Sequence, residues 1–119
     1  MQSYKDLIVW QKSIILVTEL YRVTEKFPKN EIFGLTSQIR RAAVSIPANI
    51  AEGYARKNNK EYIQFLRIAY GSGAELETHL IVAKNLNFLQ DAEILKVSSI
   101  LDEIMRMLNK LISTLMAKP

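Results

Sequence analysis

Several residue types are missing or scarce in this chain of 119 residues. There is no cysteine, which excludes disulfides and thiolate metal sites. The single histidine, His79, cannot supply the two Glu-x-x-His motifs of a helical di-metal site. Two of the four glycines, Gly71 and Gly73, lie inside a helix-patterned segment, so they do not form a phosphate-binding loop. We therefore expect neither a metal nor a cofactor.

Long apolar runs are missing as well. Charges such as Glu19, Arg22 and Arg40 interrupt every apolar stretch before it reaches the roughly 18 to 20 residues that cross a bilayer. The first residues lack the charged region, apolar block and cleavage site of a secretory signal. These absences predict a protein of the cytoplasm without a membrane partner. The length predicts one domain over residues 1–119.

Apolar residues recur at steps of three and four along most of the chain, which indicates helices. Proline, asparagine and aspartate cluster at 27–30, 56–59 and 87–91 and divide the chain into four segments. Connections this short make consecutive helices antiparallel neighbours, so the predicted fold is all-α, an up-down-up-down four-helix bundle. The residues predicted to face the core are Leu7, Trp10, Ile14, Val17, Tyr21 and Thr24; Leu35, Ile39, Ala42, Ile46, Ile50 and Gly53; Tyr62, Leu66, Ala69, Gly73, Leu76, Leu80 and Ala83; and Ile94, Val97, Leu101, Ile104, Leu108, Leu111 and Leu115.

Pro47 lies in the middle of the second segment, yet the apolar spacing stays in phase across it. A helix that restarted there would have Ile46 as its cap, which is a poor capping residue. The pattern therefore favours one continuous helix with a kink at Pro47. The alternative is that the bend shapes a surface for a partner. At the starts of the third and fourth helices, Asn59 and Asp91 are the predicted caps.

Two of the predicted helices carry a second apolar stripe. These stripes are Leu16, Leu20, Val23 and Phe27 in the first helix, and Val44, Ala48, Ala51 and Ala55 in the second. Large exposed apolar patches are rare on monomers, so we expect these faces to pack between subunits of a homo-oligomer. The alternative is that wide stripes deepen a single core and that exposed alanines need no partner.

The net charge of +4 is localised in the sequence. Residues 40–67 hold six basic and two acidic side chains, whereas ten of each balance elsewhere. A localised basic surface attracts phosphate backbones, so we predict that these side chains bind RNA or DNA. The predicted nucleic-acid-binding residues are Arg40, Arg41, Arg56, Lys57, Lys60 and Arg67. The alternative is a solvated face that pairs in part with Glu52 or Glu61.

Two tyrosines and a polar stripe lie in the same region, and each has a structural and a functional interpretation. Tyr54 and Tyr62 flank the basic turn and could stack on bases, although aromatic residues at such positions usually serve packing. A polar stripe along the second segment predicts a hydrogen-bond network that fixes register. It consists of Gln38, Arg41, Ser45, Asn49, Glu52 and Arg56.

Catalytic chemistry has weaker support. Glu52 with Glu75 or Glu77 is a conceivable acid–base or metal-binding pair. Ser72 and His79 are seven residues apart on a helix, about 10 Å, which is too far for a nucleophile and its base. The sequence therefore predicts that the protein is not an enzyme.

A set of short motifs runs in order along nearly the whole chain. They are Phe27-Pro28, Glu31, Gly34-Leu35-Thr36, Gln38-Ile39-Arg40-Arg41-Ala42, Ser45-Ile46, Asn49-Ile50-Ala51-Glu52-Gly53, Phe65-Leu66, Gly71-Ser72 and Glu75-Leu76-Glu77. This set resembles the four-helix-bundle family named for proteins encoded in intervening sequences of bacterial large-subunit ribosomal RNA genes. The resemblance implies a helical bundle that has no known enzymatic activity and assembles as a homopentamer.

The same family is similar to the accessory variability protein of diversity-generating retroelements. That relative is a pentameric barrel whose basic outer surface associates with nucleic acid and with a reverse transcriptase. At the matching positions, this similarity supports Arg40 and Arg41 as nucleic-acid contacts. Arg56, Lys57, Lys60 and Arg67 are predicted from charge alone.

Two functional hypotheses follow from the sequence. The first is a non-enzymatic homo-oligomer whose basic surface binds RNA or DNA without sequence specificity. The second is a structural scaffold for protein partners, in which Arg40 and Arg41 form ion pairs within or between subunits.

Overall fold

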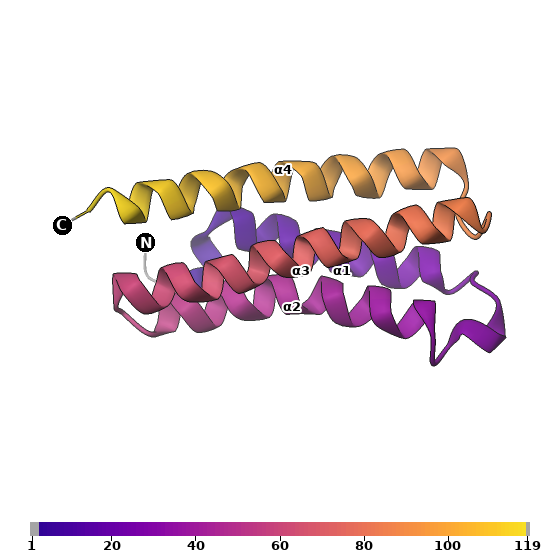
Figure 1. The fold of residues 1–119 in the computed structure, drawn as a ribbon, viewed down its shortest axis with the longest axis horizontal. Coiled ribbons are helices and arrows are strands. Elements are labelled where there is room, and N and C mark those ends of the chain that lie inside the picture. The colour runs from indigo at the N-terminus through magenta and orange to yellow at the C-terminus, as the bar shows by residue number, and fades with distance from the viewer. Residues whose placement is uncertain (1–2, 119) are drawn as a thin grey trace.

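A computed structural model describes residues 3–118 and contains four long helices (Figure 1). They are α1 (Ile8–Thr24), α2 (Leu35–Ala55), α3 (Asn59–Asn85) and α4 (Asp91–Met116). Two short 3-10 helices, η1 (Tyr4–Asp6) and η2 (Lys29–Glu31), precede α1 and α2. No strand occurs between residues 3 and 118, so the all-α prediction is confirmed.

The four helices lie side by side along the long axis of a particle that measures 49 × 23 × 21 Å. Helix α1 packs on α2 and α4, and α3 packs on the same two helices; the α2–α3 contact is the most extensive. In Figure 1 the α2–α3 turn, the start of α1 and the end of α4 lie at one end of the particle. The α1–α2 and α3–α4 connections lie at the opposite end.

A continuous apolar core runs between the helices, and three of them present the residues that the spacing predicts. In α2 all six predicted residues are buried. In α3 and α4 the predicted residues are buried except Tyr62, Ile94 and Leu111, which are partly buried and pack against the core. The period of the apolar residues therefore identified the inner face of these helices correctly.

The predicted inner face of α1 is only partly correct. Thr24 is buried, and Leu7, Trp10 and Val17 are partly buried against the core, but Ile14 and Tyr21 are exposed, at 39% and 43%. Leu16 and Leu20, from the second stripe, are 0% exposed. Val23 and Phe27 of the same stripe are also buried. The stripe that we expected between subunits is therefore core, and it gives no argument for an oligomer.

A buried hydroxyl group explains this error. The core stripe of α1 includes Ser13, which interrupts its apolar pattern in the sequence. Its Oγ donates a hydrogen bond of 2.7 Å to the Val9 carbonyl, as Thr24 Oγ1 does to the Leu20 carbonyl. A hydroxyl that donates a hydrogen bond to its own helix can be buried at little cost, so Ser13 lies in the core.

The caps of α3 and α4 lie one residue earlier than predicted. Asn58, not Asn59, caps α3, and its Oδ1 accepts the amide of Glu61 at 3.0 Å. Gln90, not Asp91, caps α4 in a reciprocal capping box with Glu93. Helix α2 runs without interruption through the buried Pro47, as the phase of its apolar residues predicts.

Ion pairs join α1 to α4 and give a testable dependence on pH. Lys26 pairs with Glu93, and Lys96 pairs with Glu19 at 3.3 Å. The hydrogen bond from Lys26 lowers the pKa of Glu93, and the bond from Arg22 lowers the pKa of Glu19. A carboxylate with a lowered folded-state pKa contributes stability above its unfolded pKa, and this contribution is lost as the pH falls through the folded value.

We therefore expect the free energy of unfolding to fall below about pH 4.3, the ordinary glutamate value. In Glu93→Gln, the fall in the free energy of unfolding at acidic pH should be smaller than in the wild type, because one of the titrating carboxyl groups is absent. Urea denaturation of both proteins at neutral and acidic pH measures the difference. An identical pH dependence in the two proteins would show that the Lys26–Glu93 pair does not contribute.

Candidate nucleic-acid interface

The six predicted basic residues fall into two separate groups. Arg40 and Arg41 lie in the second turn of α2, whereas the others surround the α2–α3 turn. Arg41 and Arg56 are 15 positions apart, which corresponds to about 22 Å of helix. One continuous basic surface made of all six residues is therefore not present on a single chain.

Arg40 is tied to α1. Its Nε donates a hydrogen bond to Thr24 Oγ1 at 2.9 Å, and its Nη2 donates to the carbonyl of Tyr21 at 3.2 Å. The guanidinium also lies 4.5 Å from the centre of the Tyr21 ring. The two hydrogen bonds use two of its five N–H donors and hold the end of α1 against α2.

Arg41 is exposed and has no ion pair within residues 3–118. It lines a polar groove of about 350 Å³ between α2 and α3, together with Gln38, Ala42, Ser45, Ser72 and Glu75. Ser45 and Ser72 share a hydrogen bond of 2.7 Å across the two helices. Asn49 Nδ2 donates to the Ser45 carbonyl at 2.8 Å, so part of the predicted polar network is present.

Arg56 forms ion pairs with both acidic side chains near the α2–α3 turn. Its Nη2 lies 3.2 Å from Glu52 Oε2, and its Nη1 lies 3.8 Å from Glu61 Oε1. The guanidinium also lies 5.0 Å from the centre of the Phe65 ring. Both acidic side chains nearest the turn therefore pair with Arg56 and not with the neighbouring lysines.

Lys57 and Lys60 are exposed at the turn itself, and within the described residues neither has an ion-pair partner. Lys57 has a φ of 57°, a left-handed conformation that reverses the chain before α3. Arg67 is also exposed, and its one described side-chain contact is from Nη2 to Met116 Sδ at 3.1 Å. Three cations of this region therefore lack an ion-pair partner among the described residues, and residues 52–67 carry a net charge of +2.

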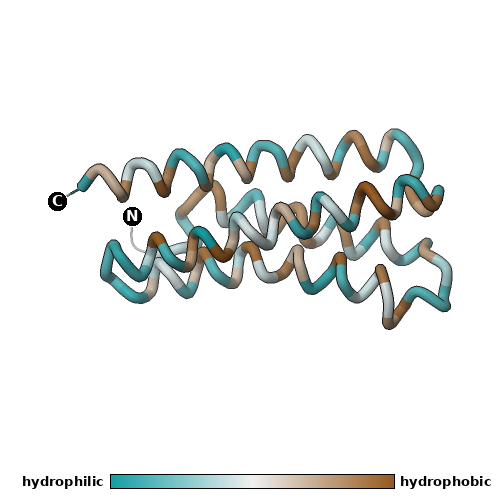
Figure 2. The backbone as a smooth tube through the Cα atoms, viewed as in Figure 1, coloured by the Kyte–Doolittle hydropathy of each residue, from teal (hydrophilic) through white to brown (hydrophobic). Residues whose placement is uncertain are grey.

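The contact between Arg67 and Met116 brings the last turns of α4 beside the start of α3. Residues 52–67 and 106–118 together hold seven basic and two acidic side chains, a net charge of +5. Figure 2 shows the hydrophilic colour of the α2–α3 turn at this end. We call this surface the basic end and define it by Arg56, Lys57, Lys60, Arg67, Lys110 and Lys118. The last two were missed in the sequence, although the antiparallel order of helices places the end of α4 near the start of α3.

Tyr62 packs inside the bundle. Its ring lies edge-on to that of Tyr54, with centroids 6.0 Å apart. Its hydroxyl is buried without a hydrogen-bond partner among the described atoms, and burial raises the pKa of this hydroxyl. Of the two interpretations of Tyr62, packing fits this geometry and base stacking does not.

Ser72 and His79 make separate contacts in the described part of the chain. His79 Nε2 lies 3.2 Å from Glu75 Oε2, whereas Ser72 bonds to Ser45, so no serine–histidine pair forms. Among residues 3–118 no three or more His, Asp or Glu side chains gather closely enough to hold a metal ion. In the same range, no helix is long and apolar enough to span a membrane.

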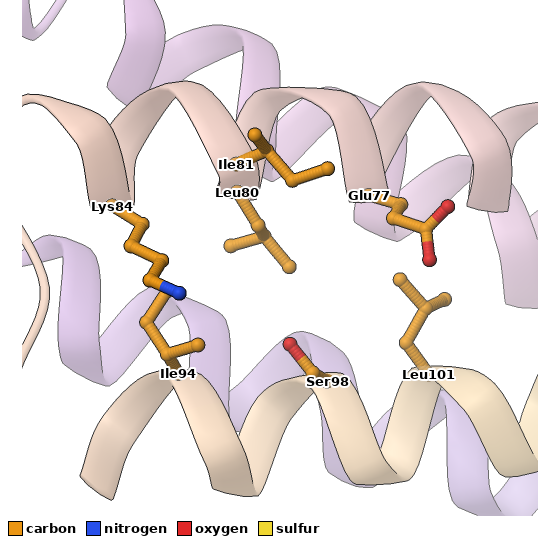
Figure 3. A pocket seen from close by; sticks show the side chains of 7 residues that line it. All are labelled: Glu77, Leu80, Ile81, Lys84, Ile94, Ser98 and Leu101. Carbon is orange, nitrogen blue, oxygen red and sulfur yellow. The ribbon is translucent and has the colours of Figure 1, made fainter. Parts of the chain in front are cut away.

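A small cavity of about 190 Å³ lies between α3 and α4. Figure 3 shows Leu80 and Ile81 opposite Ser98 and Leu101, with the charged groups of Glu77 and Lys84 along the α3 side. Ser98 has the one hydroxyl in this lining, and no histidine stands beside it as a base. The rest of the lining consists of four aliphatic side chains.

Comparison with known proteins places the chain in a family. No curated protein matches it. A solved structure of a protein of unknown function from the S23 ribosomal protein family of Bacteroides thetaiotaomicron is similar, with a TM-score of 0.79 and 23% identity. The match covers 88% of this chain and 98% of that one, and it supports the fold alone. The sequence model of the 23S rRNA-intervening sequence proteins matches residues 5–110, which confirms the resemblance seen in the motifs. The chain therefore belongs to the family of 23S rRNA-intervening sequence proteins.

Proposed function

We propose that this protein is a non-enzymatic, homo-oligomeric helical bundle whose basic end binds the phosphate backbone of RNA or DNA without sequence specificity. One observation carries the proposal: Lys57 and Lys60 are exposed at the α2–α3 turn without an ion-pair partner among the described residues, while Glu52 and Glu61 both pair with Arg56. Such a surface attracts phosphates by Coulomb attraction and by the release of counterions.

The location of the lysines adds support. Lys57 and Lys60 flank the first turn of α3, where the helix dipole is positive. Cations at a helix N-terminus cost roughly 0.3–1 kcal/mol each. A bound phosphate would interact favourably with both lysines and with the unpaired amides of the first turn. The unfavourable charges of the free protein thus become favourable contacts in a complex.

The proposal includes an architecture and an assembly. The helices alternate up and down, α2 kinks at Pro47, and the chain forms the homopentamer that the family resemblance implies, in the cytoplasm. The apolar face of α2 supports self-association, because Val44, Ala48 and Ala55 are exposed and Ala51 is half-buried. Five copies would present five basic ends to one polyanion.

Fluorescence anisotropy with a labelled single-stranded RNA of about 20 nucleotides tests the binding. We expect the affinity to fall steeply between low and physiological salt. The double change Lys57→Glu with Lys60→Glu should weaken binding about tenfold or more, because it reverses two phosphate contacts. Arg40→Glu is a poorer test, since it also breaks the hydrogen bonds to Thr24 and Tyr21.

A matched control uses Lys84→Glu with Lys96→Glu. Both lysines are exposed, and they lie in the last turn of α3 and the second turn of α4, near the opposite end of the bundle. The control makes the same change in net charge, so it should weaken binding about twofold or less. Equal losses in the two double variants would contradict a site at the basic end, as would a wild type that does not bind.

The competing proposal is a scaffold for a protein partner. The exposed apolar residues of α2 favour it, and Arg40 and Arg56 already bond within their own subunit. An oligomer that binds no nucleic acid at low salt would favour this scaffold role over the basic-end proposal.

A further inference from the structure

The α1–α2 connection holds the most exposed large apolar side chain among the described residues. Phe33 is 95% exposed and the adjacent Ile32 is 49% exposed. The backbone here is fixed by hydrogen bonds: the Gly34 amide donates to the Glu31 carbonyl at 3.0 Å, and the Leu35 amide donates to Glu31 Oε1 at 3.0 Å. A large aromatic side chain on a hydrogen-bonded turn loses little further backbone entropy on binding. We call this feature the Phe33 knob.

A groove of about 350 Å³ lies at the same end of the bundle, between the end of α1 and the start of α2. Its lining combines apolar walls with polar and charged groups: Thr24, Glu25, Phe27, Pro28, Lys29, Ile32, Thr36 and Arg40. The Arg40 guanidinium already stacks over Tyr21, and a guanidinium is a good partner for an aromatic ring. We call this feature the Arg40 groove. Its volume and lining suit one aromatic side chain.

We infer that the Phe33 knob of one copy inserts into the Arg40 groove of a neighbouring copy of the same chain. The inference rests on the self-association proposed above and assigns residues to it. Charge complementarity supports a second copy as the occupant. Within residues 3–118, neither Glu25 in the groove nor Lys29 on the knob turn has an ion-pair partner, and Lys29 of one copy can pair with Glu25 of the next.

The proposed contact fits a ring of copies. If each copy gives its knob to one neighbour and receives a knob from another, the contact is heterologous, and parallel copies side by side repeat it around a ring. In a two-fold dimer the same two copies would instead exchange knobs reciprocally. In the ring arrangement Arg40 contacts the neighbouring subunit. The basic end lies at the other end of the bundle and stays free to bind nucleic acid.

Sedimentation velocity of Phe33→Ser tests the knob. Leu95→Ser is the matched control, because Leu95 is 73% exposed in the first turns of α4. We expect Phe33→Ser to raise the dissociation constant of the oligomer about tenfold or more, as for a central anchor of an interface. Leu95→Ser should leave it within about twofold. Circular dichroism spectra that match the wild type show that both variants fold.

Cysteine cross-linking tests the pairing directly, because the chain has no cysteine of its own. Lys29→Cys and Glu25→Cys proteins, each with one thiol, are mixed under conditions that exchange subunits and are then oxidised. A covalent dimer should form in the mixture and in neither protein alone. Both proteins retain Phe33, so the knob stays intact.

The outcomes separate this inference from the proposed function. A monomeric wild type overturns both the self-association and the knob contact. An oligomeric wild type that survives Phe33→Ser and gives no mixed cross-link overturns the knob contact alone. A covalent dimer of Lys29→Cys by itself overturns the heterologous arrangement. Loss of RNA binding in Phe33→Ser with an intact oligomer would assign Phe33 to base stacking instead.

Discussion

Leu20→Ala is expected to lower the free energy of unfolding by about 3 kcal/mol, because a cavity remains where a fully buried leucine stood. Leu20 is 0% exposed in the core stripe of α1. The matched change Ile14→Ala lies on the other apolar stripe, where the side chain is 39% exposed. It should cost about 1 kcal/mol or less, since little apolar area is lost. Urea denaturation followed by circular dichroism measures both.

This pair of variants tests which face of α1 is the core. The two proteins must be compared at one protein concentration, because self-association adds to the apparent stability. A larger loss for Ile14→Ala than for Leu20→Ala would mean that α1 is rotated toward the face that the sequence pattern predicts. That result would also return Leu16, Leu20 and Val23 to a surface between subunits.

Gly53→Ala is expected to destabilise the protein by about 2 kcal/mol through overpacking, even though alanine is the better helix former. A Cβ at this position would lie 2.8 Å from Phe65 Cβ, 3.0 Å from Tyr62 Cδ1 and 3.2 Å from the Tyr62 carbonyl oxygen. The last of these atoms is backbone, so relief requires α2 and α3 to move apart. Thermal and urea denaturation measure the loss.

Gly71→Ala is the matched control for Gly53→Ala. A Cβ at Gly71 meets no atom within 4 Å, and the position is exposed on α3. Alanine there should raise the free energy of unfolding by about 0.5–1 kcal/mol, because a helical glycine loses more backbone entropy on folding. If both variants gain stability equally, Gly53 does not set the spacing between α2 and α3.

Apolar spacing predicted the fold well where one apolar stripe dominates a helix. In α2 the phase held through Pro47, since burial of Ile46 and Ile50 on one face outweighs the local cost of a proline. In α1 two stripes have the same period, and periodicity alone does not decide between them. Ser13 lies among the core residues of α1, and its hydroxyl bonds within the helix and so permits burial.

The count of charges predicted where basic residues gather. It did not predict which of them are already bonded to other side chains. The bond between Arg40 and Thr24 joins residues 16 positions apart on different helices, and no local pattern signals it. The pairing of Arg56 with Glu52 was suggested by their four-residue spacing. Lys110 and Lys118 belong to the basic end because the last turns of α4 pack beside α3. A count of charges along the sequence does not reveal this contact.

The basic end also makes the bundle an electric dipole along its 49 Å axis, because residues 52–67 and 106–118 carry +5 and the rest of the chain carries −1. Near a polyanion this dipole experiences a torque that turns the basic end forward. At physiological ionic strength the field decays over about 8 Å, a small fraction of the axis. Rotational alignment is therefore confined to the last stage of an encounter, whereas in dilute buffer it begins while the two molecules are still apart.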